Sequence, residues 1–392
     1  MSEADTEAPI SDGAARSRRL SAPWRMLFVV WTAASILLCF NQQFTLRFFV
    51  GFTLLDTEYF WALIALLLPL AFLLYPVKPG VHVDHVPWYD MLAFAAATLL
   101  AAALIWSARE SAAAGWEYSG PDVAPRWLLW GAVAMWVLVL EALRRAGGWV
   151  LLVIMGAFSV FPLFAAVMPA PLTASSVSLL EAASYHLFSR ESVLGIPMRA
   201  FAEVVIGFLV FGTALQMTGA GTFFINFAFA VCGRYRGGAA KVAIFSSGLL
   251  GSMSGSVISN VLTTGTLTIP AMKRTGFKAT TAGAIEACAS TGAVLAPPVM
   301  GATAFVMAEF LNISYAEVAL GAAIPAAMYF FALFIQIDCS AGRQAMVGLP
   351  PEEMPKLREV MRDGWYFIFV ILLLVVLLLV MKRENWAPWL AT

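Results

Sequence analysis

Residues 251–265 read GSMSGSVISNVLTTG, and ten of these fifteen positions are Gly, Ser, Thr or Asn. The sequence around them is apolar, as is most of the chain: 61% of its 392 residues are hydrophobic, 12% are charged, and its mean hydropathy is +0.81. Soluble domains carry about 25% charged residues. The chain is therefore predicted to be an integral membrane protein, in which such a polar stretch needs a physical reason.

Apolar segments long enough to cross a bilayer recur along the chain, and all are expected to be helical because isolated strands cannot satisfy their backbone in lipid. The sequence predicts an all-α polytopic membrane protein with about nine spans, at residues 26–41, 59–76, 88–107, 127–143, 149–168, 197–217, 279–311, 316–336 and 364–381. The 24 Lys and Arg residues balance the 24 Asp and Glu residues, so no basic surplus favours nucleic acid as a partner.

The segment 242–271 contains the opening stretch and either crosses the membrane once or returns to its starting side as a re-entrant hairpin. Cytoplasmic loops carry the excess of Lys and Arg, so charge can compare the two topologies. With a cytoplasmic N-terminus, 17 of the 24 basic residues lie in the cytoplasm if the segment is a hairpin, and 12 if it crosses. The sequence therefore favours a hairpin. Its tip, near Ser254 to Thr264, is then a non-helical turn that must be covered by protein or line a wet cavity.

The segment 279–311 is also interrupted. Pro297 and Pro298 remove two backbone donors and clash with the preceding turn, so the helix is expected to break between Gly292 and Pro298. Discontinuous helices are typical of secondary transporters, which use helix ends and free carbonyls to hold substrate and ions near the bilayer midplane. The hydroxyl, amide and carbonyl oxygens of the stretch suit a hard cation such as sodium.

Other interpretations of these residues stay open. Gly and Ser at helical spacing also suit close helix packing. Ser254 beside glycine suggests a serine hydrolase, although no histidine lies in a predicted span to act as its base. Glu203 and Glu286 lie within spans, where a carboxyl group is a functional candidate. Glu286 alternatively favours the positive end of its helix.

Cysteine and histidine give no pattern typical of a transition-metal site. The four cysteines are scattered and are expected to be free thiols: Cys39, Cys232, Cys288 and Cys339. His82 and His85 are expected to lie in a solvated loop, because no further His or Cys is near them. The first apolar segment follows a basic stretch but offers no small-residue cleavage site, so it is predicted to remain as an uncleaved span.

The stretch 251–310, GSMSGSVISNVLTTGTLTIPAMKRTGFKATTAGAIEACASTGAVLAPPVMGATAFVMAEF, closely resembles the fused membrane permease of the tripartite ATP-independent periplasmic (TRAP) transporters, and in particular their TAXI subgroup. The resemblance covers about residues 22–350 and is most specific from FAEVVIGFLVFGTALQMTGAGTFFINFAFAVCGRYRGGAAKVA (201–243) onward. It implies a sodium-driven importer of small organic anions, such as carboxylates, in the bacterial inner membrane. A soluble periplasmic binding protein would deliver the substrate, and Na⁺ would be the coupling ion with no further cofactor.

The resemblance also implies a division of the chain and a binding site. Residues 1–21 would be a cytoplasmic polar tail, 22–147 a four-span domain like the small membrane subunit, and 148–392 the first repeat of the large subunit. The resemblance assigns one sodium site to Ser254, Gly255, Ser256, Asn260, Gly292, Val294 and Pro297. It assigns the substrate contacts to Thr263, Thr264 and Ser290.

The chain departs from this family pattern in one respect. The large subunit of the family has two inverted repeats, each with a hairpin and a broken helix, and no second match to the SGS…SN stretch occurs in the 392 residues. The expectation is that a second polypeptide supplies the other repeat or that the chain is a fragment. The alternative to a transporter that acts alone is an assembly or structural half of a permease, inactive without that second polypeptide.

Overall fold

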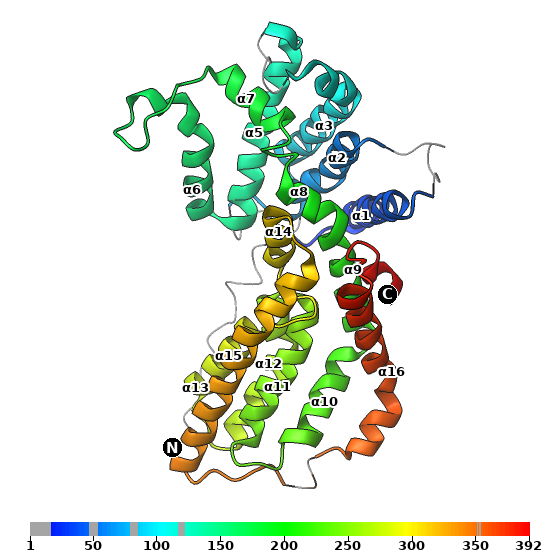
Figure 1. Cartoon of the computed structure of the whole chain (residues 1–392), viewed down its shortest axis with the longest axis vertical. Helices are drawn as coiled ribbons and strands as arrows, with labels where there is room; N and C mark the ends of the chain where they lie inside the picture. Colours follow the sequence, from blue (N-terminus) through cyan, green and yellow to red (C-terminus); the bar gives the residue numbers. More distant parts are fainter. Residues whose placement is uncertain (1–16, 47–53, 79–84, 117–121, 351, 353) are drawn as a thin grey trace. The chain divides into compact units, whose positions relative to one another are not determined.

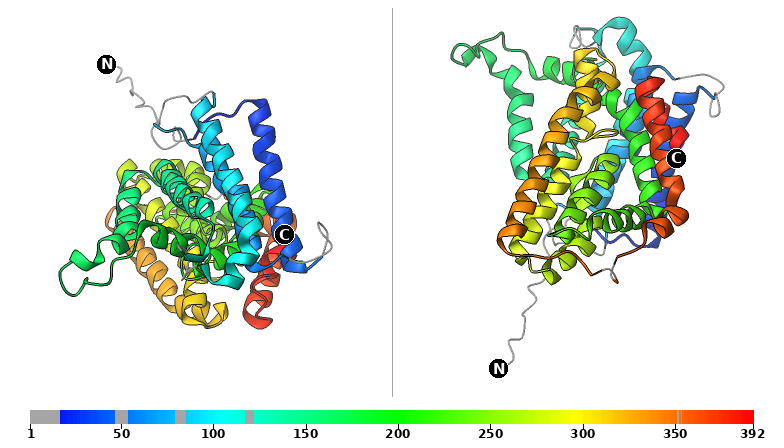
Figure 2. Two further views of the ribbon diagram at one scale, coloured as in Figure 1. Left: turned by 90° about the horizontal axis from the view of Figure 1, so that it is seen from above. Right: turned by 60° about the horizontal axis from the view of Figure 1, so that its bottom comes forward.

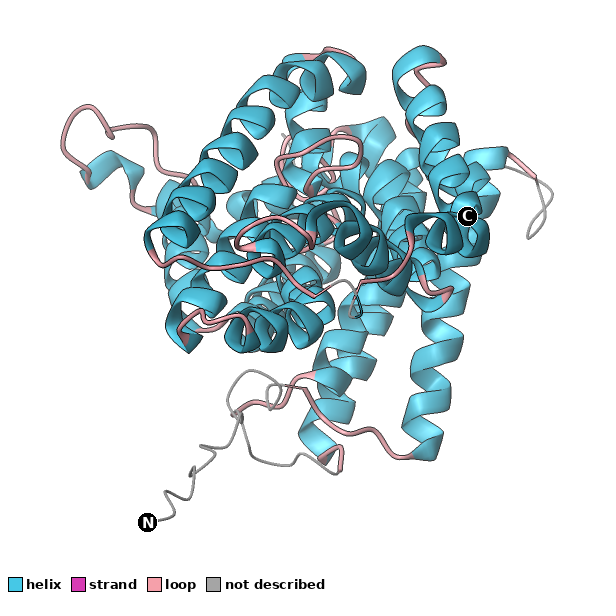
Figure 3. Cartoon of the chain, turned by 90° about the horizontal axis from the view of Figure 1, so that it is seen from below, coloured by secondary structure: helices cyan, strands magenta, loops and turns pink. Residues whose placement is uncertain are grey.

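The described part of the chain is helical. The computed structural model describes residues 17–46, 54–78, 85–116, 122–350, 352 and 354–392, and these residues contain no strand (Figure 3). The chain divides into two compact units, residues 1–199 and 200–392. Residues 1–16 of the expected cytoplasmic tail, and His82, lie outside the described residues.

The first unit is built from apolar helices that pack around α2 and α5. Its helices are α1 (Ala22–Phe44), α2 (Asp56–Leu74), α3 (Trp88–Ala114), α5 (Arg126–Gly147), α6 (Trp149–Val160) and α7 (Leu179–Phe188). Helix α2 packs on α1 and α3, and α5 packs on α3, α6 and α7. Asp90 is fully buried between Arg18, at 2.7 Å, and Arg145, at 2.6 Å. The two guanidinium groups compensate the buried carboxylate and connect the segment before α1 to α3 and α5.

The second unit holds most of the residues singled out by the sequence. Helix α8 (Ile196–Ala200) leads into it through the π-helical turn η4 (Phe201–Val205). Its helices are α9 (Ile206–Met217), α10 (Ala220–Cys232), α11 (Gly238–Ser254), α12 (Val257–Arg274), α13 (Ala279–Ala293), α14 (Ala302–Leu311), α15 (Tyr315–Arg343), α16 (Leu357–Val375) with the π-helical turn η6 (Val376–Val380), and α17 (Ala387–Ala391). Figure 1 shows α11, α12, α13 and α15 side by side. Helices α11 and α13 pack on each other, and α12 and α15 each pack on both of them.

Seven helices in the described part are long and apolar enough to cross a membrane, so the all-α polytopic membrane fold is confirmed. They cover 22–44, 56–74, 88–114, 126–147, 196–217, 315–343 and 357–380. Two of the nine expected segments contain shorter apolar helices, at 149–163 and 302–311. The sequence predicted no span between 218 and 241, where the structure has the 13-residue helix α10.

Helices α11 and α12 form an antiparallel hairpin, which the right-hand view of Figure 2 also shows among the helices of this unit. Ser247 on α11 contacts Thr264 on α12, and Gly251 faces Asn260, so positions pair in opposite directions along the two helices. The expected non-helical turn from Ser254 to Thr264 is wrong in length, because only Gly255 and Ser256 lie between the two helices. Gly255 makes so short a turn possible by adopting a left-handed conformation with φ of 62°. Ser256 then caps α12 by accepting a hydrogen bond from the backbone N–H of Ser259.

The expected break in the segment 279–311 is confirmed. Helix α13 ends at Ala293, residues 294–301 are not in an α-helix, and α14 begins at Ala302. The Pro297–Pro298 pair lies inside this break, where neither residue has a backbone N–H to donate. Two interrupted helical segments therefore follow each other in the second unit.

Both ends of the hairpin lie at the same end of the second unit. The backbone N–H of Leu349, after α15, donates to the carbonyl of Gly233, just before α11. Phe277, after α12, packs in one cluster with Ala240 near the start of α11 and Ile337 near the end of α15. The loops that follow α10, α12 and α15 therefore meet at one end, opposite the tip of the hairpin.

Candidate functional site

A buried carboxyl group lies where the hairpin packs against α13. Glu286 on α13 is fully buried, and its oxygens contact hydroxyl groups from both arms of the hairpin. Oε1 accepts from Ser247 Oγ at 2.9 Å and from Thr264 Oγ1, and lies 3.4 Å from Ser290 Oγ. Oε2 accepts from Thr268 Oγ1 at 2.5 Å. These five side chains, Ser247, Thr264, Thr268, Glu286 and Ser290, form what we call the hydroxyl cluster.

The cluster depends on the small residue Gly265 and contains no basic group. A Cβ atom at Gly265 would lie 3.2 Å from Cγ of Glu286, so any larger side chain would displace the carboxyl group. None of the ion pairs among the described residues includes Glu286. Hydroxyl groups alone therefore solvate this carboxyl group, an unusual arrangement because buried carboxylates are normally paired with a cation.

Asn260 lies next to the hydroxyl cluster, toward the tip of the hairpin. Its side chain is fully buried, and its Nδ2 donates to the carbonyl of Ser247 at 2.9 Å. Its Oδ1 is buried and has no hydrogen-bond partner among the described residues. Gly251 makes room for the amide, since a Cβ there would lie 2.4 Å from Nδ2 of Asn260 and 2.4 Å from Cβ of Ala293. An unpartnered amide oxygen in a buried polar site is a suitable cation ligand.

The break after α13 packs directly on the tip of the hairpin. The backbone N–H groups of Val299 and Met300 both donate to the carbonyl of Ser252, at 3.0 and 3.2 Å. A Cβ at Gly255 would lie 2.6 Å from the carbonyl oxygen of Met300. The hydroxyl of Tyr315, at the start of α15, lies 2.6 Å from the carbonyl oxygen of Val299 and holds the break from its other side. Backbone carbonyls and two helix N-termini, those of α12 and α14, thus surround the tip.

The structure brings together most of the residues expected to bind sodium. Ser254, Gly255 and Ser256 form the tip, and Asn260 lies one turn into α12. The other three lie at the end of α13 and in the break: Gly292, Val294 and Pro297. The last three do not share one environment, however. Gly292 packs on the ring of Tyr329, and Pro297 lines an apolar pocket with Phe330 and Phe334.

The residues expected to contact substrate, on α12 and α13, do not all lie together. Thr264 and Ser290 belong to the hydroxyl cluster, where both lie near the same carboxyl oxygen of Glu286. Thr263, one position earlier, turns about 100° away. Its Cγ2 would lie 3.2 Å from a Cβ at Gly221, so Thr263 faces α10 instead.

Three members of the hydroxyl cluster were not assigned from the sequence. Ser247 and Thr268 lie outside the stretch 251–265, and Glu286 was only a candidate with two possible roles. A signal was nevertheless present, because Thr264 and Thr268 are four residues apart and hence on one face of a helix. Only the packing of three helices brings both of them to Glu286.

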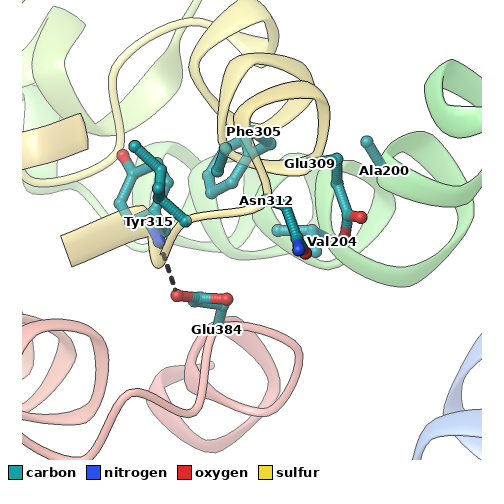
Figure 4. Close-up of a pocket in the computed structure, with 9 residues that line it drawn as sticks. Ala200, Val204, Phe305, Glu309, Asn312, Tyr315 and Glu384 are labelled. Carbon is teal, nitrogen blue, oxygen red and sulfur yellow. Dashed lines mark hydrogen bonds between the residues drawn. The ribbon is translucent and has the colours of Figure 1, made fainter. Parts of the chain in front are cut away.

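A second polar feature of this unit is a cavity of about 140 Å³ near the start of α15. Figure 4 shows Glu309, Asn312 and Glu384 around it, with Glu384 accepting from the backbone N–H of Tyr315 at 2.8 Å. Burial raises the pKa of Glu384, and the charge of Glu309 raises it further, while the N–H of Tyr315 opposes both effects. Among the described residues, no group of three or more His, Cys, Asp and Glu side chains is arranged to hold a metal ion.

The four cysteines form no disulfide. Cys39 and Cys232 are buried, and Cys288 and Cys339 are exposed. The expectation of free thiols is therefore confirmed. Burial raises the pKa of the Cys232 thiol, and the charge of Lys241 partly opposes this.

Comparison with known proteins identifies a family. Residues 134–392 match the family model described as tripartite ATP-independent periplasmic transporter, DctM component. One curated relative is the C4-dicarboxylate TRAP transporter large permease protein DctM of Pseudomonas aeruginosa, which is 30% identical over 130 residues. That alignment covers 31% of this chain and 30% of the relative, so the chain spans less than a third of the length of the curated relative that it matches.

Proposed function

The chain belongs to the DctM component family of the tripartite ATP-independent periplasmic transporters, and we propose that it is the permease component of a sodium-driven importer of small carboxylates. The family is one of transporter permeases, not enzymes. The curated relative is named for C4-dicarboxylates, which supports dicarboxylates as the first substrates to test. A periplasmic binding protein delivers the substrate, and the permease lies in the bacterial inner membrane.

The observation that carries this proposal is the packing of the broken helix on the tip of the hairpin. Two helix N-termini and the backbone carbonyls of the break lie there, and the Oδ1 of Asn260, which has no partner among the described residues, lies one turn into α12. Oxygen atoms of this kind suit a sodium ion, and helix N-termini attract a carboxylate. We therefore place the sodium ion at the tip, with Asn260 as a ligand, and the substrate carboxylate at the N-terminal ends of α12 and α14.

Sodium couples to substrate because each ion improves the site for the other. A cation at the tip adds positive charge beside the carboxylate and orders the turn formed by Ser254, Gly255 and Ser256. The two bind better together than apart, and the coupling is reciprocal. The loaded hairpin and broken helix then move together across the membrane.

We propose that the hairpin is re-entrant, with both ends on the cytoplasmic side. Helix α11 has 17 residues and α12 has 18, so each is about 25 Å long. The hydrocarbon core is about 30 Å thick, and a hairpin of this length ends inside it. The end of the unit where α11 begins and α12 ends is rich in Lys and Arg, as the positive-inside rule requires of a cytoplasmic end. Its basic residues are Arg234, Arg236, Lys241, Lys273, Arg274, Lys278 and Arg343.

The finer assignments are also proposals. We place the chain in the TAXI subgroup and assign residues 22–147 to a part equivalent to the small membrane subunit. A second hairpin and broken helix, supplied by sequence outside these 392 residues or by another polypeptide, completes the binding site. The competing function is that of an assembly or structural half of a permease, which is inactive without a second polypeptide and requires no sodium ion at the tip.

Replacing Asn260 with Ala tests the transport function. In proteoliposomes that contain the reconstituted assembly and its binding protein, the sodium concentration for half-maximal uptake should rise several-fold, because the tip loses a ligand. Thr266→Ala is the matched control, since Thr266 is exposed on the same helix. An unchanged sodium dependence in Asn260→Ala, with only lower thermal stability, would favour the structural role.

A further inference from the structure

The hydroxyl cluster has enough hydrogen atoms to solvate Glu286 as a charged carboxylate. Each hydroxyl group carries one hydrogen and can donate it to one acceptor at a time. Ser247 and Thr264 can donate to Oε1, and Thr268 can donate to Oε2 over 2.5 Å. Three charge-assisted hydrogen bonds then hold the ionised group.

The same atoms satisfy the neutral acid equally well. The hydroxyl of Thr268 lies 3.0 Å from the carbonyl oxygen of Thr264, and the hydroxyl of Thr264 lies 2.8 Å from the carbonyl oxygen of Asn260. When a proton from water binds Oε2, this new O–H group donates to Thr268 Oγ1. The hydrogen of Thr268 then turns to the carbonyl of Thr264. One O–H bond forms, the charge of Glu286 changes from −1 to 0, and no polar group loses its partner.

In the part of the chain that the structure describes, the charged groups nearest this carboxyl group have other partners or are exposed. Helices α11, α12 and α13 surround Glu286, and the charged side chains of α11 and α12 are directed elsewhere. Lys241 on α11 pairs with Asp338 of α15 at 2.5 Å, and Lys273 and Arg274 on α12 are exposed. On α13, the thiol of Cys288 is exposed. On α15, which packs against α11 and α13, Tyr329 donates to the carbonyl of Cys288 at 2.9 Å.

The remaining titratable groups of α15 have partners or positions outside the hydroxyl cluster. Glu317 accepts from the hydroxyl of Ser314, Arg343 ends the helix, and Cys339 is exposed. Among the described residues, Glu286 therefore has hydroxyl partners and no ion pair. A buried carboxyl group in this setting differs from the usual structural glutamate, which is held by Arg or Lys.

We propose that Glu286 is a proton-binding site, and that its proton and the sodium ion at the hairpin tip oppose each other's binding. This proposal rests on the transport function proposed above. Ser247 connects the two sites, because its hydroxyl contacts Glu286 and its backbone carbonyl holds the side chain of Asn260, and the hydroxyl of Thr264 lies between Glu286 and the backbone of Asn260. The carbonyl of Ser247 accepts from Nδ2 of Asn260, and the hydroxyl of Thr264 lies by the carbonyl of Asn260. Ionised Glu286 attracts a cation to the tip, and protonation removes that attraction.

Infrared difference spectroscopy of the full chain detects the proton directly. As the pH is lowered, each carboxyl group that takes up a proton gains a carbonyl band, so the Glu286 signal is the part of the wild-type difference spectrum that Glu286→Gln lacks. Glu384→Gln is the matched control and should keep the Glu286 signal, because Glu384 is a half-buried carboxyl group of the same unit that lies at the cavity near the start of α15. Identical difference spectra for wild type and Glu286→Gln would overturn the proposal.

Thr268→Val provides a second variant that retains the carboxyl group. Valine has nearly the shape of threonine but no hydroxyl, so the protonated Glu286 loses its acceptor. The band should remain in this variant and move toward the frequency of a weakly hydrogen-bonded acid. An unmoved band would show that another carboxyl group is the source, and would overturn the assignment even if Glu286→Gln fails to fold.

Sodium titrations at several pH values separate this proposal from the transport function. The affinity of the wild-type protein for Na⁺ should fall several-fold as the pH is lowered, whereas that of Glu286→Gln should be weaker and independent of pH. If no sodium binds at any pH but the band still titrates, the sodium site fails and the proton site stands. A carboxylate signal that responds to sodium and not to pH would make Glu286 a sodium ligand and overturn the proton site.

Discussion

At the scale of single residues, Gly251 controls how closely the hairpin approaches α13. A methyl group there would meet both Ala293 and Asn260 at 2.4 Å, closer than packed atoms tolerate. We expect Gly251→Ala to lower the free energy of unfolding by about 1–3 kcal/mol, the usual cost of overpacking. Thermal unfolding in detergent measures this. Gly283→Ala is the matched control on α13, because nothing lies within 4 Å of its added methyl group, and its stability should stay equal or rise.

Glu384 should make the stability of the second unit depend on pH. Burial and then the charge of Glu309 raise its pKa, so the folded protein keeps a proton that the unfolded chain releases. The folded state then binds more protons, and the stability from Glu384 is present at low pH and is lost as the pH rises from the ordinary glutamate range through the raised pKa. Glu384→Gln still accepts from Tyr315 but cannot ionise.

Thermal unfolding as a function of pH tests this prediction for Glu384. The melting temperature of Glu384→Gln should fall less than that of the wild type when the pH rises above about 4.5. Glu309→Gln should shift the wild-type loss to lower pH, because it removes the charge that helps to raise the pKa. Parallel curves for wild type and Glu384→Gln would contradict the prediction.

At the scale of helices, Tyr315 fixes the break to the start of α15. Its buried hydroxyl lies 2.8 Å from the carbonyl of Pro298 and 2.6 Å from that of Val299. We expect Tyr315→Phe to lower the free energy of unfolding by about 1–2 kcal/mol, because these buried carbonyls lose their donor. Hydrogen exchange should also increase in residues 294–301.

Tyr329→Phe is the control for Tyr315→Phe. Its hydroxyl donates to the carbonyl of Cys288 at 2.9 Å, but this bond is exposed. The variant should lose less stability and leave exchange in the break unchanged. Equal effects of the two substitutions would show that the hydroxyl of Tyr315 does not position the break.

The sequence could predict the hairpin from the distribution of basic residues along the chain, and the break from a local cause, whereas the turn within the hairpin is also local. Gly255 in a left-handed turn, Ser256 as a helix cap and the Pro297–Pro298 pair each act within a few residues. Helix α10 escaped prediction because its 13 residues are too few to cross a membrane. Glu286 remained ambiguous for another reason: its partners come from α11, α12 and α13, and no local pattern shows which faces of three helices meet.

At the scale of the whole molecule, charge and helix packing make separate arguments for the topology. The count of basic residues in the sequence favours a hairpin. The structure places the start of α11 and the end of α12 at the basic end of the second unit. The charge count and the helix packing do not show on which side of the membrane each end lies. Sidedness therefore needs its own measurement.

Single cysteines before and after the hairpin measure this sidedness. Arg234 and Lys273 are both exposed and flank the hairpin, so cysteines at these positions react without disturbing its packing. The background lacks the four native cysteines, and an impermeant thiol reagent is applied to intact cells and to inverted membranes. Because both positions lie at the basic end, we expect both to react only in inverted membranes. Reaction of the two from opposite sides would mean that 242–271 crosses the bilayer once, and the small polar residues of 251–265 would then be helix-packing groups rather than the tip of a re-entrant hairpin.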